Sequence, residues 1–191
     1  MTNSPAFALR APLSLLALSV LVACGSEPAT PPTALPPYEG QQQVLFDDNI
    51  DPAAVGLAME GVMPAQDPML RSRAIDADVT ARMRVQTVTR DSVGAKTIYT
   101  INLQVGQPTL MPAELDQQTF ELRVDQECRA FGLIQSMENQ LRAKTFIGFV
   151  RRFAGEGAPE IHWHLTADTP EVAQVIAEIA VLEEVAGQDA P

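Results

Sequence analysis

Apolar and polar residues alternate along three stretches in the middle of the chain, and a period of two predicts half-buried β-strands. The segment 90–96 lies between the first two stretches and contains polar residues and Gly94, so we expect it to be a hairpin loop. The inward positions of the three stretches are Val79, Ala81, Met83 and Val85; Tyr99, Ile101, Leu103 and Val105; and Phe120, Leu122 and Val124.

Two further strands and two helical segments are predicted in the last third of the chain. The stretch 146–150 is apolar at nearly every position, which is typical of a central strand covered on both faces. The segment 161–165 alternates again, and we expect a helical turn within 131–141. A proline and an acidic residue follow Asp168, which indicates a helix start. The apolar face of this last helix is predicted to be Val172, Val175, Ile176, Ile179 and Leu182.

This order of elements predicts a mainly β domain of the α+β class over residues 44–186, with about five antiparallel strands and a C-terminal amphipathic helix. Over residues 76–186 it resembles OB-type barrels, including the netrin-like modules of exported proteins, and the resemblance implies a partly closed barrel. An open sheet with the last helix packed on one face is the alternative. Residues 44–46 are interpreted as an edge strand or as a plug over the core.

Residues 1–23 carry a single charged side chain, Arg10, and the uncharged run from Ala11 to Ala23, directly before Cys24, is almost wholly apolar. As a helix, the uncharged part would rise only about 20 Å, less than the roughly 30 Å of a bilayer core. We therefore interpret residues 1–23 as a signal peptide. The sequence Leu21-Val22-Ala23-Cys24-Gly25 resembles the lipobox of bacterial lipoproteins.

The resemblance to the lipobox implies cleavage before Cys24, a diacylglycerol on its sulfur and attachment of the chain to a membrane. In this family an aspartate after the lipidated cysteine favours the inner membrane. Residue 25 is a glycine, so the resemblance implies that the chain is anchored in the periplasmic leaflet of the outer membrane. Two or three acyl chains hold a protein stably on a bilayer. Residues 24–43 are rich in proline and are predicted to be a tether, and the tail 187–191 is expected to fray.

Acidic residues outnumber basic ones by 24 to 13, so the formal net charge is −11. Such a surface repels phosphates, and we expect no nucleic-acid partner. The chain has two cysteines, and lipidation of Cys24 would leave Cys128 without an intramolecular partner. We expect Cys128 to be a buried thiol, with an intermolecular disulfide or a reactive site as alternatives.

Two short motifs are candidates for metal binding. His162 and His164 lie on the same face of a predicted strand and would share a metal if a neighbouring strand supplied a third ligand. The alternative is that both rings face water, because Ile161, Trp163 and Leu165 explain the alternation. Asp47–Asp51 begins like an EF-hand loop but lacks its central glycine and final glutamate, which favours a solvated turn. No cofactor is expected.

Arg82 and Arg84 share the polar face of the first predicted strand and are candidate ligand-binding residues for a carboxylate or phosphate. The alternative is pairing with acids of neighbouring strands, such as Glu121. No serine lies in Gly-x-Ser-x-Gly, and no phosphate-binding loop occurs. We therefore predict a non-enzymatic envelope module that binds a protein or an envelope polymer. A small-ligand or metal-binding receptor is the alternative, and an exported hydrolase is the least favoured hypothesis.

Overall fold

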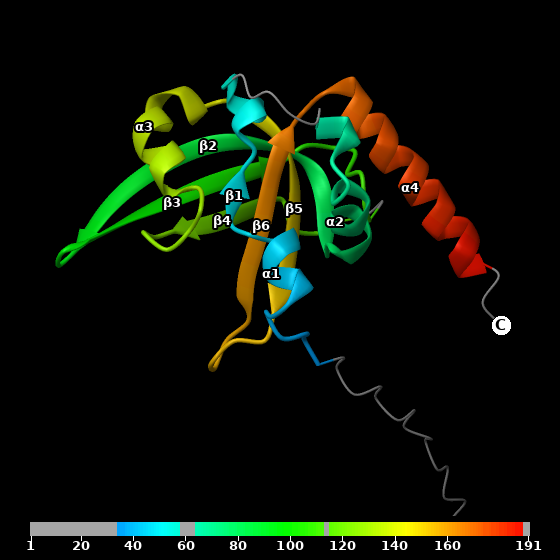
Figure 1. Ribbon diagram of the computed structural model, residues 1–191, viewed down its shortest axis with the longest axis horizontal. Coiled ribbons are helices and arrows are strands. Elements are labelled where there is room, and N and C mark those ends of the chain that lie inside the picture. Colours follow the sequence, from blue (N-terminus) through cyan, green and yellow to red (C-terminus); the bar gives the residue numbers. More distant parts are fainter. Residues whose placement is uncertain (1–33, 58–63, 113–114, 189–191) are drawn as a thin grey trace, which may run out of the picture. The chain divides into compact units, whose positions relative to one another are not determined.

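A six-stranded mixed sheet forms the centre of the computed structural model, which describes residues 34–57, 64–112 and 115–188 (Figure 1). The predicted signal peptide and Cys24 lie outside the described residues. The order of strands in the sheet is β1-β6-β5-β2-β3-β4. The short strand β1 runs parallel to β6, and the other neighbours are antiparallel.

The strands are β1 (Asn49–Ile50), β2 (Val79–Val93), β3 (Lys96–Val105), β4 (Thr119–Val124), β5 (Thr145–Phe153) and β6 (Glu160–Ala167). The helices are α1 (Gln41–Leu45), α2 (Leu70–Asp76), α3 (Phe131–Leu141) and α4 (Pro170–Gln188). Two short 3-10 helices, η1 (Pro52–Val55) and η2 (Pro64–Gln66), lie between β1 and α2.

The predicted mainly β, α+β class is confirmed, and the sheet is open instead of closed into a barrel, with β1 and β4 at its edges. Helices cover both faces of the sheet: α3 packs on one face, and α1, α2 and α4 pack on the other (Figure 1). Because the helices already bury both faces, the sheet does not need to close on itself to exclude water from its apolar side chains.

Strand β5 is central, between β2 and β6, as predicted from its apolar character. Its side chains divide between the two cores: Phe146 and Val150 lie on the α3 side, while Ile147 and Phe149 lie on the side of α1, α2 and α4. The predicted inward residues of β2, β3 and β4 are all buried in the core on the α3 side.

The prediction that residues 90–96 form a loop is wrong. β2 continues to Val93, which pairs with Lys96, so the turn consists of Gly94 and Ala95. Gly94 has a φ of +65°, a conformation that glycine adopts without strain. The polar residues 90–92 lie in the part of the β2–β3 hairpin that extends past the core into solvent. Exposed strand residues can be polar on both faces, and their composition therefore resembles that of a loop.

Residues 36–43, which were predicted to belong to the tether, contact the folded domain. Pro37 forms a β-bridge with Ala154, and α1 begins at Gln41. At the end of α1, Leu45 and Phe46 are buried in the core that α2 and α4 cover. Of the residues 44–46, Leu45 and Phe46 thus plug the core while Val44 is 49% exposed, and the edge-strand alternative is not found.

The predicted apolar face of α4 is only partly buried. Val172, Ile176 and Ile179 enter the core beside α2, whereas Leu182 is 52% exposed. The helix also continues to Gln188, into the tail that was expected to fray. None of the helices in the described segments has the length and apolar character needed to cross a bilayer.

Candidate functional site

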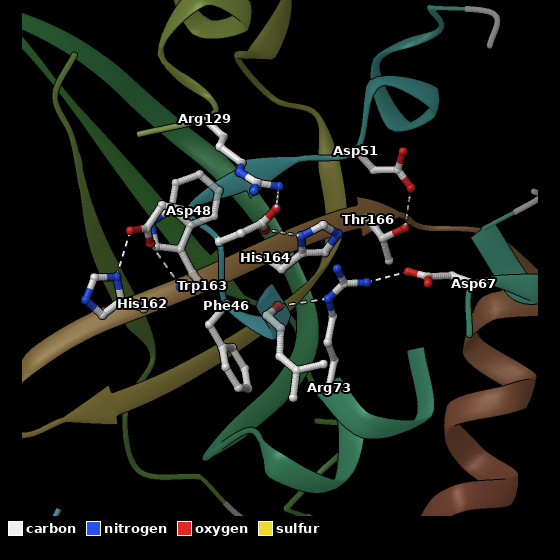
Figure 2. A network of polar contacts seen from close by, with 12 residues as sticks. Phe46, Asp48, Asp51, Asp67, Arg73, Arg129, His162, Trp163, His164 and Thr166 are labelled. Atoms are coloured by element: carbon white, nitrogen blue, oxygen red, sulfur yellow. Dashed lines mark hydrogen bonds and ion pairs between the residues drawn. The ribbon is translucent and has the colours of Figure 1, made fainter. Parts of the chain in front are cut away.

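The acidic segment 47–51 and the pair His162 and His164 meet in the structure, although 114 residues separate Asp48 from His162 (Figure 2). Strand β1 lies beside β6, with Asn49 opposite His164. Asp48 Oδ2 lies 2.7 Å from His162 Nδ1, and Asp47 Oδ1 lies 2.8 Å from His164 Nδ1. The site therefore contains two adjacent aspartate–histidine pairs.

Two successive aspartates reach the same strand because the backbone turns at Asp48, which has a φ of +48°. In an extended strand, consecutive side chains point to opposite faces. Aspartate tolerates the left-handed conformation better than most residues, so this position suits the residue that occupies it. Asp48 Oδ1 also accepts a hydrogen bond from the backbone N–H of Trp163, at 3.2 Å.

The expectation that both histidines face water is wrong: the side chain of His164 is 8% exposed and that of His162 is 17% exposed. Ile161, expected to point inward, is 38% exposed, while Trp163 and Leu165 are buried as predicted. The reason is that the segment before β1 covers the face of β6 that carries the histidines. A period of two in one strand does not reveal such a covering segment.

Tyr38 covers the ring of His162. The two rings stack with their centroids 3.4 Å apart and an interplanar angle of 6°, and the Tyr38 hydroxyl donates to the carbonyl oxygen of Phe46 at 2.6 Å. Burial, with the nearby charge of Asp48, raises the pKa of Tyr38 to about 12. Burial also raises the pKa of Asp48, although the hydrogen bond with His162 opposes this shift.

Charged residues surround the second pair. Arg129 Nη1 lies 3.2 Å from Asp47 Oδ2, so Asp47 contacts both an arginine and His164. Nearby, the hydroxyl of Thr166 donates to Asp51 at 3.1 Å (Figure 2). The carboxylates of the segment 47–51 are therefore engaged by β6 and by the loop before α3, and they do not form a solvated turn.

Two hollows flank this network. One, of about 370 Å³, has Tyr38, Asp48, Cys128 and His162 among its lining residues. The other, of about 340 Å³, lies on the side of His164 and is lined also by Asp51, Asp67 and Arg73. The two histidines thus border different hollows, so a ligand in one hollow would contact only one of the two rings.

Each aspartate selects the tautomer of its histidine, because a carboxylate at Nδ1 leaves Nε2 as the acceptor of the neutral ring. In His162, however, Nε2 is buried and makes no hydrogen bond to the described residues. A general base must reach a substrate proton. With Nε2 covered, the Asp48–His162 pair serves to fix β6 to the segment before β1.

The prediction of a shared metal site receives no support from these contacts. Over residues 34–57, 64–112 and 115–188, no group of three or more His, Cys, Asp or Glu side chains is arranged to hold a metal ion. His162 and His164 each use Nδ1 for a separate carboxylate. Asp47 and Asp48 are likewise engaged by the histidines, which also removes them from an EF-hand-like arrangement.

Arg82 and Arg84 line neither of the two hollows. Arg82 Nε lies 2.9 Å from Asp168 Oδ1, just before α4, so its partner is not the predicted Glu121. Arg84 is exposed on β2 opposite Gln104. Their role in ligand binding stays a prediction. Both belong to a basic cluster of five arginines within residues 71–90, and the member of this cluster that is buried near the site is Arg73.

No protein-family model, curated protein or solved structure matches the chain. The function of the site must therefore rest on the geometry of this chain alone. Two residues of the site were missed in the sequence: Tyr38 and Arg129. Only Tyr38 gave a signal, since it is the single aromatic residue in the proline-rich segment 24–43.

Cys128 is half-buried beside Asp48, and burial raises the pKa of its thiol to about 11. In the Cys24→Ala chain, where Cys128 is the only thiol, alkylation by iodoacetamide at pH 8 should be about 100-fold slower than for an exposed cysteine. The control is a chain with Cys24→Ala, Cys128→Ser and Val93→Cys, which places the thiol at an exposed position. Equal rates for the two chains would show that Cys128 is a reactive thiol.

Proposed function

We propose that the chain is a lipid-anchored protein of a bacterial envelope whose folded domain is a non-enzymatic binding module. The observation that carries the proposal is the lipobox-like sequence ending at Cys24. Nine residues lie between Cys24 and Ala34, where the described domain begins, and such a segment spans at most about 35 Å. The domain would therefore act close to the membrane surface.

The chemistry of the histidine site favours binding over catalysis. The raised pKa keeps the Cys128 thiol protonated at neutral pH, and the thiolate is the nucleophilic form. His162 Nε2 is buried, and both aspartates are engaged by histidines. Around His162, these contacts supply neither an activated nucleophile nor an accessible base, so a hydrolase that uses this ring loses support.

A receptor for a small ligand is the second candidate, and the hollow beside His162 favours it. This hollow of about 370 Å³ combines an aromatic ring, Tyr38, with carboxylates and one guanidinium, that of Arg129. Small-molecule sites are concave and contain a few polar groups in fixed positions. The size and mixed lining fit a small polar molecule better than a protein segment.

Metabolic labelling with a clickable fatty acid tests the anchor. The wild-type chain should be labelled and recovered with membranes, whereas the Cys24→Ala chain should lose the label, because the thioether requires the Cys24 sulfur. Cys128→Ala is the matched control and should keep the label. Equal labelling of the wild-type and Cys24→Ala chains would overturn the proposal.

A further inference from the structure

Exposed apolar side chains gather on the C-terminal half of α4. Val181, Leu182 and Val185 are 60%, 52% and 54% exposed, and every side chain over 181–186 is exposed. In Figure 1 this end of α4, coloured red, runs beyond α2. The first half of the helix holds it on the domain, so the second half presents an uncovered apolar surface.

The exposed apolar stripe continues towards the middle of α4, where an open surface formed by this helix alone is almost entirely apolar. This surface is lined by Gln174, Ala177, Glu178, Val181 and Leu182. Glu178 accepts a hydrogen bond from Gln174 at 3.1 Å, which places a carboxylate at the edge of this surface. The apolar surface at Val181 and Leu182 would bind an apolar side chain of a partner, and the neighbouring carboxylate of Glu178 would bind a cationic one.

The charge of α4 restricts what can cover it. The helix contains Glu171, Glu178, Glu183 and Glu184 and neither lysine nor arginine. Glu183 and Glu184 lie near its C-terminal end, where the helix dipole is negative and basic residues are the stabilising ones. A second copy of the chain would bring the same acids together, and an anionic lipid surface would also be repelled.

We propose that the C-terminal half of α4 docks a cationic amphipathic segment of another protein. This inference rests on the proposed binding function and names the chemistry of the partner. Apolar side chains of the partner, at helical spacing, pack beside Val181 and Leu182. Its lysines or arginines reach Glu178 and Glu183, which offsets the unfavourable charge at this helix end.

Fluorescence anisotropy with a synthetic helical peptide of leucine and lysine tests the proposal. The full chain is held in phosphatidylcholine nanodiscs, and binding to empty nanodiscs is subtracted. We expect saturable binding, no binding of the same peptide with glutamate in place of lysine, and an affinity at least about tenfold weaker for Leu182→Asp. Val93→Asp, at another exposed apolar residue, should stay within about twofold of the wild type.

A chain with Glu183→Gln and Glu184→Gln should bind the lysine peptide more weakly and with less dependence on salt. Equal binding by the wild-type and Leu182→Asp chains, or by the glutamate peptide, would overturn the proposal. So would a Leu182-dependent dimer in sedimentation or Leu182-dependent attachment to phosphatidylglycerol vesicles. The fatty-acid label on Cys24 does not depend on α4, so failure here is distinguishable from failure of the anchor.

Discussion

Replacing Arg73 with alanine is expected to lower the free energy of unfolding by about 3 kcal/mol, because it leaves a buried carbonyl oxygen and a carboxylate without their cation. The Arg73 side chain is 3% exposed. Its Nε donates to the carbonyl oxygen of Leu45 at 2.8 Å, and its guanidinium pairs with Asp67. The contact with Leu45 joins α1 to α2, and the contact with Asp67 holds the segment before α2, on the face of the sheet that carries the histidines (Figure 2).

Urea unfolding measures this effect through the fluorescence of Trp163, the single tryptophan, which is buried in the core. Arg71→Ala is the matched control, because Arg71 is an exposed arginine of the same helix. The control should stay within about 0.5 kcal/mol of the wild type. Equal unfolding midpoints for the two variants would contradict a structural role for Arg73.

The sequence predicted β2, β3 and β4 well because the inward and outward side chains of these strands differ in polarity. The pattern gave Val79 to Val85 correctly, and a β-bulge between Val85 and Thr87 then shifts the register so that Val88 is buried. A strictly periodic prediction does not contain this shift. Residues 90–92, at the end of β2, are polar and exposed, and for this reason they were predicted to belong to a loop.

The candidate site was predicted only in fragments. Asp47, Asp48, His162 and His164 all belonged to motifs that the sequence singled out, yet their pairing depends on β1 lying parallel beside β6. That contact joins segments more than 110 residues apart and leaves no periodic signal in either of them. Neither motif alone therefore indicated that the histidine-bearing face of β6 is covered.

The roles of individual arginines were equally hidden. Arg73 and Arg82 lie in the same basic cluster, but Arg73 is buried and donates to the carbonyl oxygen of Leu45, whereas Arg82 pairs with Asp168. In α4, the periodicity that placed Leu182 inward is correct as a helical face. Leu182 is exposed because α4 extends beyond the part of the domain that would have covered it. The spacing of apolar residues along a helix does not show how far the helix extends past the sheet.

Replacing Asp48 with alanine is expected to lower the free energy of unfolding by about 2 kcal/mol, because charge-assisted hydrogen bonds to His162 and to the backbone N–H of Trp163 are lost. Alanine also adopts the left-handed conformation at this position less readily than aspartate. Urea unfolding at pH 7 measures the loss, and an unfolding midpoint equal to that of the wild type would contradict it.

Asp48→Asn separates the hydrogen bonds from the charge. Asparagine also tolerates the left-handed conformation and keeps an acceptor for Trp163. Burial raises the pKa of Asp48 above its ordinary value of 3.8, so ionising this carboxyl costs more free energy in the folded state than in the unfolded chain. At pH 7 this variant should therefore lie within about 1 kcal/mol of the wild type, well above Asp48→Ala.

The pH dependence of the two chains follows from the same shift. The stability that the protonated Asp48 contributes is fully present below pH 3.8 and is lost as the pH rises through the raised pKa of the folded state. Lowering the pH from 7 towards 4 should therefore favour the wild type over Asp48→Asn. Equal stabilities of Asp48→Asn and Asp48→Ala at pH 7 would contradict this account. They would mean that the charge of the ionised carboxylate holds β6 to the segment before β1, and that the hydrogen-bond acceptor for Trp163 and the backbone conformation of residue 48 contribute little.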